Sequence, residues 1–241
     1  MSEPRPLGTD PRDLLAALPG DLLLRQLANR WEPSLPAYAL GGAVSMFHLW
    51  GDEPEIVVVG DDGDAYDLAR FVAPSLRPWL SLPAGAGRRL VAEGWSEEEG
   101  WAFRWTTEAP PVPGDAVWLH DDDEVRALLD VAFPHASMPV GHPDVRRWAG
   151  VRRDGRLVAV AADATQTEGL GFLASIATLP DARGTGAGTA VTAFATAELV
   201  REHGACGLWH MAANPSAIAV YDRLGYRDDH HMAVVGAPTA S

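Results

Sequence analysis

The spacing of apolar residues predicts alternating strands and helices along the C-terminal half of this chain. Apolar side chains recur at helical spacing between residues 122 and 133, which predicts a helix there. Short runs rich in β-branched and apolar residues, bounded by Gly, Pro or Asp, predict strands. These runs lie at residues 116–120, 145–151, 156–164, 173–179 and 207–212. An alanine-rich stretch without Gly or Pro predicts a helix over 189–203, and the pattern ends in a helix over 214–224 and a strand containing His230 and His231.

The N-terminal half has its own set of predicted elements. Pro19-Gly20 separates two short helices, and Leu68, Phe71 and Val72 form the expected apolar face of a third. The predicted helices cover 10–18, 21–30, 64–73 and about 88–93, and the predicted strands cover 43–50, 55–60, 79–82 and 101–106. A Pro-rich connector at 108–115 follows. We therefore expect a smaller α/β domain at 1–107 and a second domain at 115–241.

The segment 176–188, IATLPDARGTGAG, carries the clearest chemical signal. An apolar strand stops at a proline, a glycine loop follows, and a helix begins. The unpaired N–H groups of a first helical turn, together with the helix dipole, make such a place an anion site. Gly184, Gly186 and Gly188 let a phosphate approach the backbone, and Arg183 adds a cation at the loop entrance.

The glycine spacing excludes two common phosphate loops. A Walker loop would end in Gly-Lys-Ser/Thr, whereas Gly188 is followed by Thr189 and Ala190. A dinucleotide fingerprint needs G-x-G-x-x-G after the first strand of its domain, and Gly184-x-Gly186 followed by Gly188 does not fit it. The loop therefore binds some other phosphate-bearing ligand, if it is more than a turn.

A second motif follows in the expected order. Asn214 and Pro215 are residues typical of a helix start, and Gly225 is typical of a helix end. Together, Arg183-x-x-Gly186-x-Gly188 and the string NPSAIAVYDRLGY resemble the GNAT (Gcn5-related) N-acetyltransferases over residues 115–236. The resemblance implies an α/β (α+β) fold with a mixed, mostly antiparallel sheet flanked by helices. The N-terminal half is similar to the degenerate half of glycine N-acyltransferase-like members.

The resemblance also implies roles for particular residues. Acetyl-coenzyme A is the implied co-substrate, and Asn214 matches the residue that contacts its pantetheine arm. Tyr221, seven residues or about two turns later, matches the proton donor to the leaving thiolate, and a packing tyrosine is the alternative. The implied cofactor-binding residues are Ile176, Ala177, Thr178, Arg183, Gly184, Thr185, Gly186, Ala187, Gly188, Thr189 and Asn214. Backbone N–H groups near Ile176 and Thr178 would hold the thioester carbonyl if their strand splays from its neighbour.

The general base is harder to assign. Many family members carry a glutamate on the strand before the loop, but here that strand reads GLGFLASIAT. Glu168, in the preceding turn, is the candidate catalytic base, and an exposed turn glutamate is the alternative. Asp163 and His210 are second choices, and an amine that loses its proton to water is another possibility. The resemblance places the irregular segment 133–143, with His135, on the acceptor side, although a surface loop fits the sequence equally well.

Composition limits the partners and the cellular location that we expect for this chain. A net charge of −14 argues against nucleic acid as a general partner, and the Asp/Glu cluster at 121–124 lacks the His or Cys of a metal site. With one cysteine, no signal peptide and no apolar run of membrane-spanning length, we expect a cytoplasmic protein, monomer or homodimer, with no membrane or metal.

The combined motifs predict an N-acetyltransferase that acetylates a primary amine of a small molecule or amino acid. Because the strand before the loop lacks a glutamate, an inactive module that binds or senses acyl-coenzyme A is an alternative function. An acetyltransferase of protein N-termini or lysines, and an interaction protein using the fold as a scaffold, are the remaining alternatives.

Overall fold

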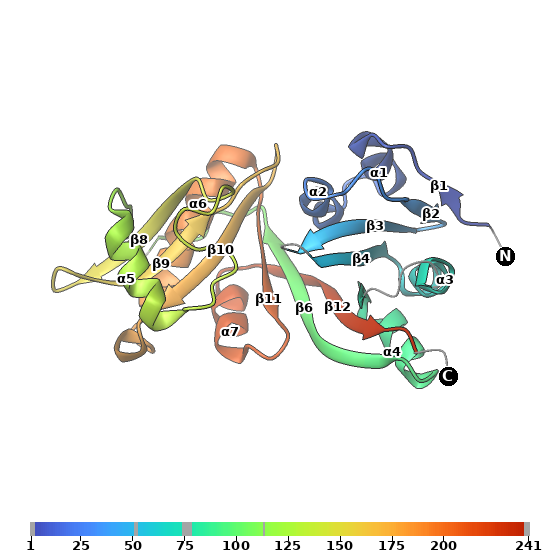
Figure 1. Ribbon diagram of the computed structural model, residues 1–241. Coiled ribbons are helices and arrows are strands. Elements are labelled where there is room, and N and C mark those ends of the chain that lie inside the picture. The colour runs from blue at the N-terminus through green and yellow to red at the C-terminus, as the bar shows by residue number, and fades with distance from the viewer. Residues whose placement is uncertain (1–2, 51–52, 74–78, 113, 239–241) are drawn as a thin grey trace. The chain divides into compact units, whose positions relative to one another are not determined.

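The computed structural model describes residues 3–50, 53–73, 79–112 and 114–238, which form two compact units (Figure 1). Unit 1 consists of Met1–Phe103, His210–Asn214 and Asp228–Ser241, and unit 2 of Arg104–Trp209 and Pro215–Arg227. The chain passes from unit 1 to unit 2 close to the predicted boundary. Two later segments of the chain belong to unit 1. The prediction of consecutive domains 1–107 and 115–241 does not include this return, because local sequence patterns do not indicate which distant strands pair.

Unit 1 is a mixed sheet with the strand order β1-β2-β3-β4-β5-β12-β6. Its helices are α1 (Pro11–Ala17), α2 (Leu22–Ala28), α3 (Asp62–Val72) and α4 (Ala84–Ala92). Its strands are β1 (Arg5–Pro6), β2 (Tyr38–Leu40), β3 (Ala43–Trp50), β4 (Glu53–Gly60), β5 (Trp79–Pro83), β6 (Ser96–Thr106) and β12 (Arg227–Gly236). Ile56, Val58 and Leu80 pack with α3 and α4 on one face, and the alternating Val57 and Val59 are buried on the other.

Unit 2 contains the strands β11-β10-β9-β8-β7 in spatial order. Along the chain these elements are β7 (Val117–Trp118), α5 (Asp122–Ala132), β8 (Arg147–Arg153), β9 (Arg156–Asp163), β10 (Gly171–Thr178), the 3₁₀ turn η2 (Pro180–Ala182), α6 (Ala187–His203), β11 (Cys206–Met211) and α7 (Pro215–Arg223). β10 runs parallel to β11 and antiparallel to β9. Seven consecutive residues of β9 are buried, because α5 and α6 cover opposite faces of the sheet (Figure 1).

Aspartates start four of the helices, as local sequence rules predict. Asp10, Asp21, Asp61 and Asp121 are the N-cap residues of α1, α2, α3 and α5, and each side chain accepts a backbone N–H of the first turn. The acids of the segment 121–124 are therefore a cap and an exposed first turn. Among the described residues, no group of three or more His, Cys, Asp and Glu is placed to hold a metal ion, and no helix there is long and apolar enough to cross a membrane.

The predicted fold class is confirmed, and the differences from the predicted elements have physical causes. The strands β1 and β2 are two and three residues long, too short for a periodic pattern. The helix α4 starts earlier than predicted, within Ala-Gly-Ala-Gly, and a Cβ on Gly87 would lie 2.4 Å from the Cβ of Ala233, so this glycine lets the helix pack closely on β12. Phe71, expected in the core, is 47% exposed and packs edge-on against Tyr38 instead.

A half-buried histidine joins α2 to β12 within unit 1. The Nε2 of His230 lies 3.2 Å from Oδ2 of Asp21, and its Nδ1 lies 2.9 Å from Oδ1 of Asp229. Burial by itself lowers the pKa of His230, but the bonds and charges of Asp21 and Asp229 outweigh it, so the pKa is raised. The folded state therefore binds this proton more tightly than the unfolded chain does.

We expect His230→Gln to lower the free energy of unfolding more in acid than in alkali. The stabilisation from a raised histidine pKa is complete below the unfolded value of ~6.5 and is lost as the pH rises through the folded value. Urea denaturation should show a loss of about 1–2 kcal/mol at about pH 5.5 and a smaller loss at about pH 9. His231→Gln is the control, because that side chain is 55% exposed. An equal loss at both pH values would contradict the prediction.

Candidate active site

The glycine loop between β10 and α6 has the geometry of an anion site. Gly184 and Gly186 have φ values of +76° and +85°, in the left-handed region that favours glycine. Gly186 is the N-cap of the 17-residue helix α6 and offers no side-chain acceptor to its first turn. The first intrahelical bond runs from Ala190 N–H to Gly186 O at 2.9 Å. The N–H groups of Ala187, Gly188 and Thr189 therefore lie ahead of it, at the positive end of the helix dipole.

The third glycine sets how closely the helix approaches the strand. A Cβ on Gly188 would lie 2.8 Å from Oγ1 of Thr178, the last residue of β10. No side chain larger than hydrogen fits at Gly188 without displacing Thr178. The strand end and the first helical turn thus meet directly.

Two arginines lie at the start of α6. Arg183 is exposed, and its Nε donates to Thr178 O at 3.3 Å. The guanidinium of Arg223, on α7, donates to Oγ1 of Thr189 at 3.4 Å. The one acid in the 3₁₀ turn, Asp181, is paired with Arg156 at 2.6 Å. These cations add to the helix dipole, so the loop suits a ligand with several negative charges.

The strand β10 separates from β11 half-way along. Its parallel pairing with β11 covers Gly171–Leu173, opposite Cys206–Leu208. A bulge then shifts its register with β9 between Ala174 and Ala177. Ser175, inside this bulge, has φ +47°, a strained value for a residue that is not glycine. The predicted splay of this strand is therefore present.

The splay leaves two backbone donors facing away from β9. Leu179 N–H donates to Val158 O at 2.9 Å, and Ala177 lies opposite Val160, so Ala177 and Leu179 bond to β9. Ile176 and Thr178 alternate with them and face the side where pairing with β11 has ended. Their N–H groups form a pair of donors separated by one residue, which is an arrangement suited to a carbonyl oxygen that gains charge.

A buried tyrosine and a buried arginine lie together near the end of α7. Tyr221 is 6% exposed, and burial raises its pKa to about 12 although Arg104 opposes this shift. Arg104, on β6, is 2% exposed and pairs with Asp222, the residue after Tyr221. The Tyr221 ring lies 5.7 Å from that of Tyr226, whose hydroxyl bonds to Thr196 at 2.7 Å.

The remaining predicted residues lie at different places. Asn214 is exposed and directly precedes α7. Glu168 is exposed in the turn before β10, at the end of the strand opposite to the glycine loop. From Gly171 to Ile176 the strand alone advances roughly 16 Å. The structure therefore does not bring Glu168 together with the backbone donors, and its role as a base stays a prediction.

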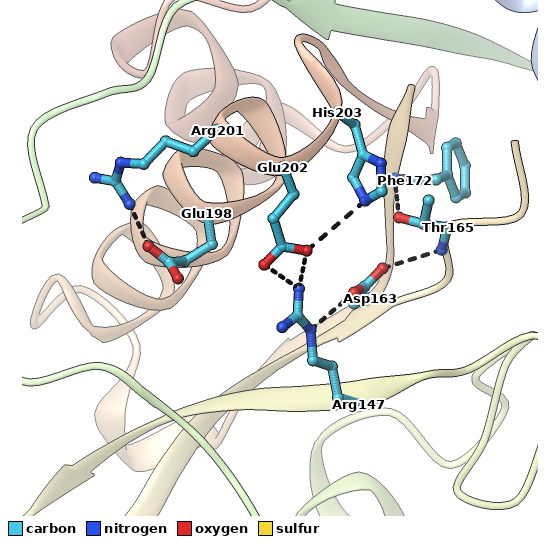
Figure 2. A network of polar contacts seen from close by, with 8 residues as sticks. All are labelled: Arg147, Asp163, Thr165, Phe172, Glu198, Arg201, Glu202 and His203. Carbon is cyan, nitrogen blue, oxygen red and sulfur yellow. Dashed lines mark hydrogen bonds and ion pairs between the residues drawn. The ribbon is translucent and has the colours of Figure 1, made fainter. Parts of the chain in front are cut away.

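The two second choices for a base already have partners. Figure 2 shows Asp163, fully buried, accepting from Arg147 Nε at 2.9 Å and from Thr165 N–H at 3.1 Å. Arg147 continues to Glu202 on α6 at 2.6 Å, so this network ties the sheet to the helix (Figure 2). His210 is 8% exposed, and its Nδ1 lies 2.9 Å from Met211 O. Asp163 therefore has a structural role here.

The segment after α5 lies against the bulge. Oγ of Ser175 donates to Met138 O at 2.8 Å, and the side chains of both residues are buried. His135 and Ser137 are exposed beside this anchor. His142 is half-buried, and its Nδ1 accepts from Asp144 N–H at 3.2 Å. That bond places the proton of the neutral ring on Nε2, which makes His142 a donor toward its surroundings.

The comparisons with known proteins agree with this geometry. Residues 149–235 match the family model of FR47-like proteins. The matched residues are less than half of the chain, and the chain shares its fold with solved GNAT proteins. No curated protein matches it.

Solved structures show the same fold over nearly the whole chain. A GCN5-related N-acetyltransferase from Kribbella flavida is 22% identical, with a TM-score of 0.60 and 97% of each chain covered. One from Sphaerobacter thermophilus is 16% identical, with a TM-score of 0.65, covering 99% of this chain and 97% of that one. A tandem GNAT protein from the clavulanic acid biosynthesis pathway is 14% identical, with a TM-score of 0.52 and 99% of each chain covered.

Three residues of the candidate site were not predicted from the sequence. Ser175 and Arg104 are single polar residues within the apolar strands GFLASIAT and WAFRWT, and each is buried. A lone charge or hydroxyl in an apolar strand was the available signal. Arg223 reaches Thr189 from another helix and gave no local signal.

We expect Gly186→Val to abolish binding of acetyl-coenzyme A. A side chain there would occupy the space in front of the helix N-terminus and oppose the positive φ. Gly155→Val is the matched control, because Gly155 also has positive φ (+78°) and no atom within 4 Å of its missing Cβ, but lies in the β8–β9 turn. Both variants should lose about 1–2 kcal/mol of stability. Calorimetric titration in which both or neither lost binding would contradict a phosphate site at this loop.

Proposed function

We propose that this chain is an N-acetyltransferase, which transfers an acetyl group from acetyl-coenzyme A to the primary amine of a small molecule or amino acid. The observation that carries the proposal is the adjacency of two sets of backbone donors. One set, Ile176 and Thr178, lies at the splayed end of β10, and the other opens α6, where Gly188 contacts Thr178. A thioester carbonyl and a pyrophosphate belong to one ligand, so donors for both at one strand–loop–helix element favour acyl-coenzyme A.

The residues present fit each part of that ligand. The N–H groups of Ala187, Gly188 and Thr189 would bind the pyrophosphate, with Arg183 and Arg223 balancing its charge. We also propose that Ala177, Gly184 and Thr185 contact the cofactor, because they lie in the same strand and loop. The exposed Asn214 would contact the pantetheine arm. No side-chain cation is needed at the carbonyl, because the two strand N–H groups face it.

The chemistry requires a neutral amine and a proton for the leaving sulfur. The amine nitrogen attacks the carbonyl carbon, the oxygen gains charge beside Ile176 and Thr178, and the C–S bond then breaks. Tyr221 would give its hydroxyl proton to the thiolate. With a pKa of about 12 it is protonated at neutral pH, and Arg104 favours the phenolate that remains after the transfer. The nitrogen, cationic after its attack, loses one proton to water, and Tyr221 regains one from water, so the net change is transfer of one proton from the amine to the sulfur.

Deprotonation of the amine has no obvious protein group. Glu168 is exposed and distant along β10, so it would act through water if it acts at all. An amine whose neutral form is already populated at the working pH needs no base, which favours weakly basic acceptors. Without a base, the rate should rise with pH as the fraction of neutral amine rises.

The N-terminal unit is proposed to be a degenerate acyltransferase-like half. The likeness of the whole chain to the tandem GNAT protein extends over 99% of both chains, and the sequence of the N-terminal unit has no glycine phosphate loop. An acyl-coenzyme A-binding module without turnover is the second candidate, favoured by the absence of an acid on β10. An acetyltransferase of protein N-termini or lysines is the third.

A panel of amines, assayed by thiol release from acetyl-coenzyme A, tests the proposal. We expect release above the rate of hydrolysis with at least one small amine or amino acid, and an acetylated product of the matching mass. Binding without release for every small amine would favour the sensing module. Release only with peptides would favour the third candidate.

We expect Tyr221→Phe to lower kcat about 100-fold with little change in affinity for acetyl-coenzyme A, because a general acid acts only in the chemical step. Tyr226→Phe is the matched control. Tyr226 is also buried, but its hydroxyl bonds to Thr196 and Cys206. It should lose about 1 kcal/mol of stability and keep kcat. An unchanged kcat in Tyr221→Phe, with chemistry rate-limiting, would return Tyr221 to a packing role.

A further inference from the structure

The peptide bond that carries one of the two strand donors is oriented by a strained serine. The N–H of Ile176 belongs to the peptide plane that follows Ser175, so the backbone angles of Ser175 decide where this N–H points. Ser175 has φ +47°, which is a strained value for a residue with a Cβ. Glycine or asparagine is the usual residue at such a position. Unlike glycine, Ser175 carries a hydroxyl, and this hydroxyl makes a hydrogen bond.

That interaction connects the bulge to the segment between α5 and β8. Ser175 is 7% exposed, and its Oγ donates to Met138 O at 2.8 Å. The side chain of Met138 is 3% exposed, so this residue is anchored by its carbonyl and by its apolar end. Around it, residues 134–146 consist of turns, bends and irregular chain, with neither helix nor strand.

The rest of that segment is fixed near its C-terminal end. Arg146 N–H donates to Asp163 O at 2.8 Å, and the turn 142–145 closes with Val145 N–H on His142 O at 3.0 Å. Between Phe133 and this turn, the hydroxyl of Ser175 bonds the segment to the sheet. Exposed His135 and Ser137 stand directly before Met138. Their position relative to the Ile176 N–H therefore depends on Ser175.

We propose that Ser175 is a positioning residue, which fixes the Ile176 donor and the acceptor-side segment 134–145 in one mutual arrangement. This inference rests on the proposed function. The attacking amine has to lie within about 3–3.5 Å of the carbonyl carbon held by Ile176 and Thr178. An acceptor bound through Ser137 or His135 meets that carbonyl only if the segment and the bulge keep their register. The hydroxyl of Ser175 supplies this register through one hydrogen bond.

Two substitutions distinguish the effect of the Ser175 hydroxyl from the effect of its backbone conformation. Ser175→Gly removes the hydroxyl and relieves the strain at φ +47°, whereas Ser175→Thr keeps the hydroxyl and disfavours that backbone. If the tether positions the acceptor, kcat/KM for the amine falls about tenfold in Ser175→Gly, as expected for one buried hydrogen bond, with acetyl-coenzyme A affinity within about twofold. Ser175→Thr should lie closer to the unmodified protein in kcat/KM for the amine, despite a lower Tm.

Hydrogen exchange supplies a readout that needs no acceptor. Amides of peptides covering 134–145 should exchange faster in Ser175→Gly than in the unmodified protein, while those of the β8–β9 turn at 153–156 stay unchanged. Unchanged exchange together with unchanged amine kcat/KM in Ser175→Gly would overturn the proposal. Normal Ser175→Gly with an impaired Ser175→Thr would also overturn it, because the backbone alone would then matter. Failure of the unmodified protein to acetylate any amine would refute the proposed function instead, whatever the exchange shows.

Discussion

The number of neighbours that β10 has along its length is the constraint on which the candidate site depends. At Leu173 the strand pairs with both β11 and β9, and beyond the bulge Ala177 and Thr178 pair with β9, where the pairing with β11 has ended. A backbone N–H that loses its ladder partner has to find water, a side chain or a ligand, because leaving it buried and unpaired is costly. The fold thus produces free donors by ending a parallel pairing early, without any dedicated binding side chain.

The glycine loop likewise presents backbone N–H groups without a side chain that caps them. Gly186 caps α6 without a side chain, and Gly188 brings the helix to the end of β10. An aspartate cap, as in four other helices of this chain, would fill the helix N-terminus with its own carboxylate. At α6 the N-cap residue supplies no carboxylate, and under the proposed function the pyrophosphate would take its place. An N-terminal carboxylate therefore separates the four aspartate-capped helices from α6, whose first-turn N–H groups could accept an anionic ligand.

Local signals account for what the sequence could predict. Helix caps, breakers and periodicity act over a few residues, which is why α5, α6, β3 and the glycine loop lie where the pattern placed them. Features that need a distant partner were not predictable. The N-terminal part of β6, SEEE, carries no strand pattern and is extended because it lies beside β12, as the Ser96–Gly236 contact at 3.2 Å shows. The roles of Ser175 and Arg104 follow from Met138 and Asp222, and neither partner is near in sequence.

The place of β12 has a consequence for how the protein is made. This strand pairs with β5, opposite Trp79–Pro83, and lies more than half of the chain further along the sequence. Until it leaves the ribosome, β5 is an open edge carrying the core residues Leu80 and Leu82. All of unit 2 is synthesised during that interval. The nascent N-terminal unit must therefore wait with an unfinished sheet, a state in which strand edges recruit other chains, so its folding yield should depend on how fast translation proceeds through unit 2.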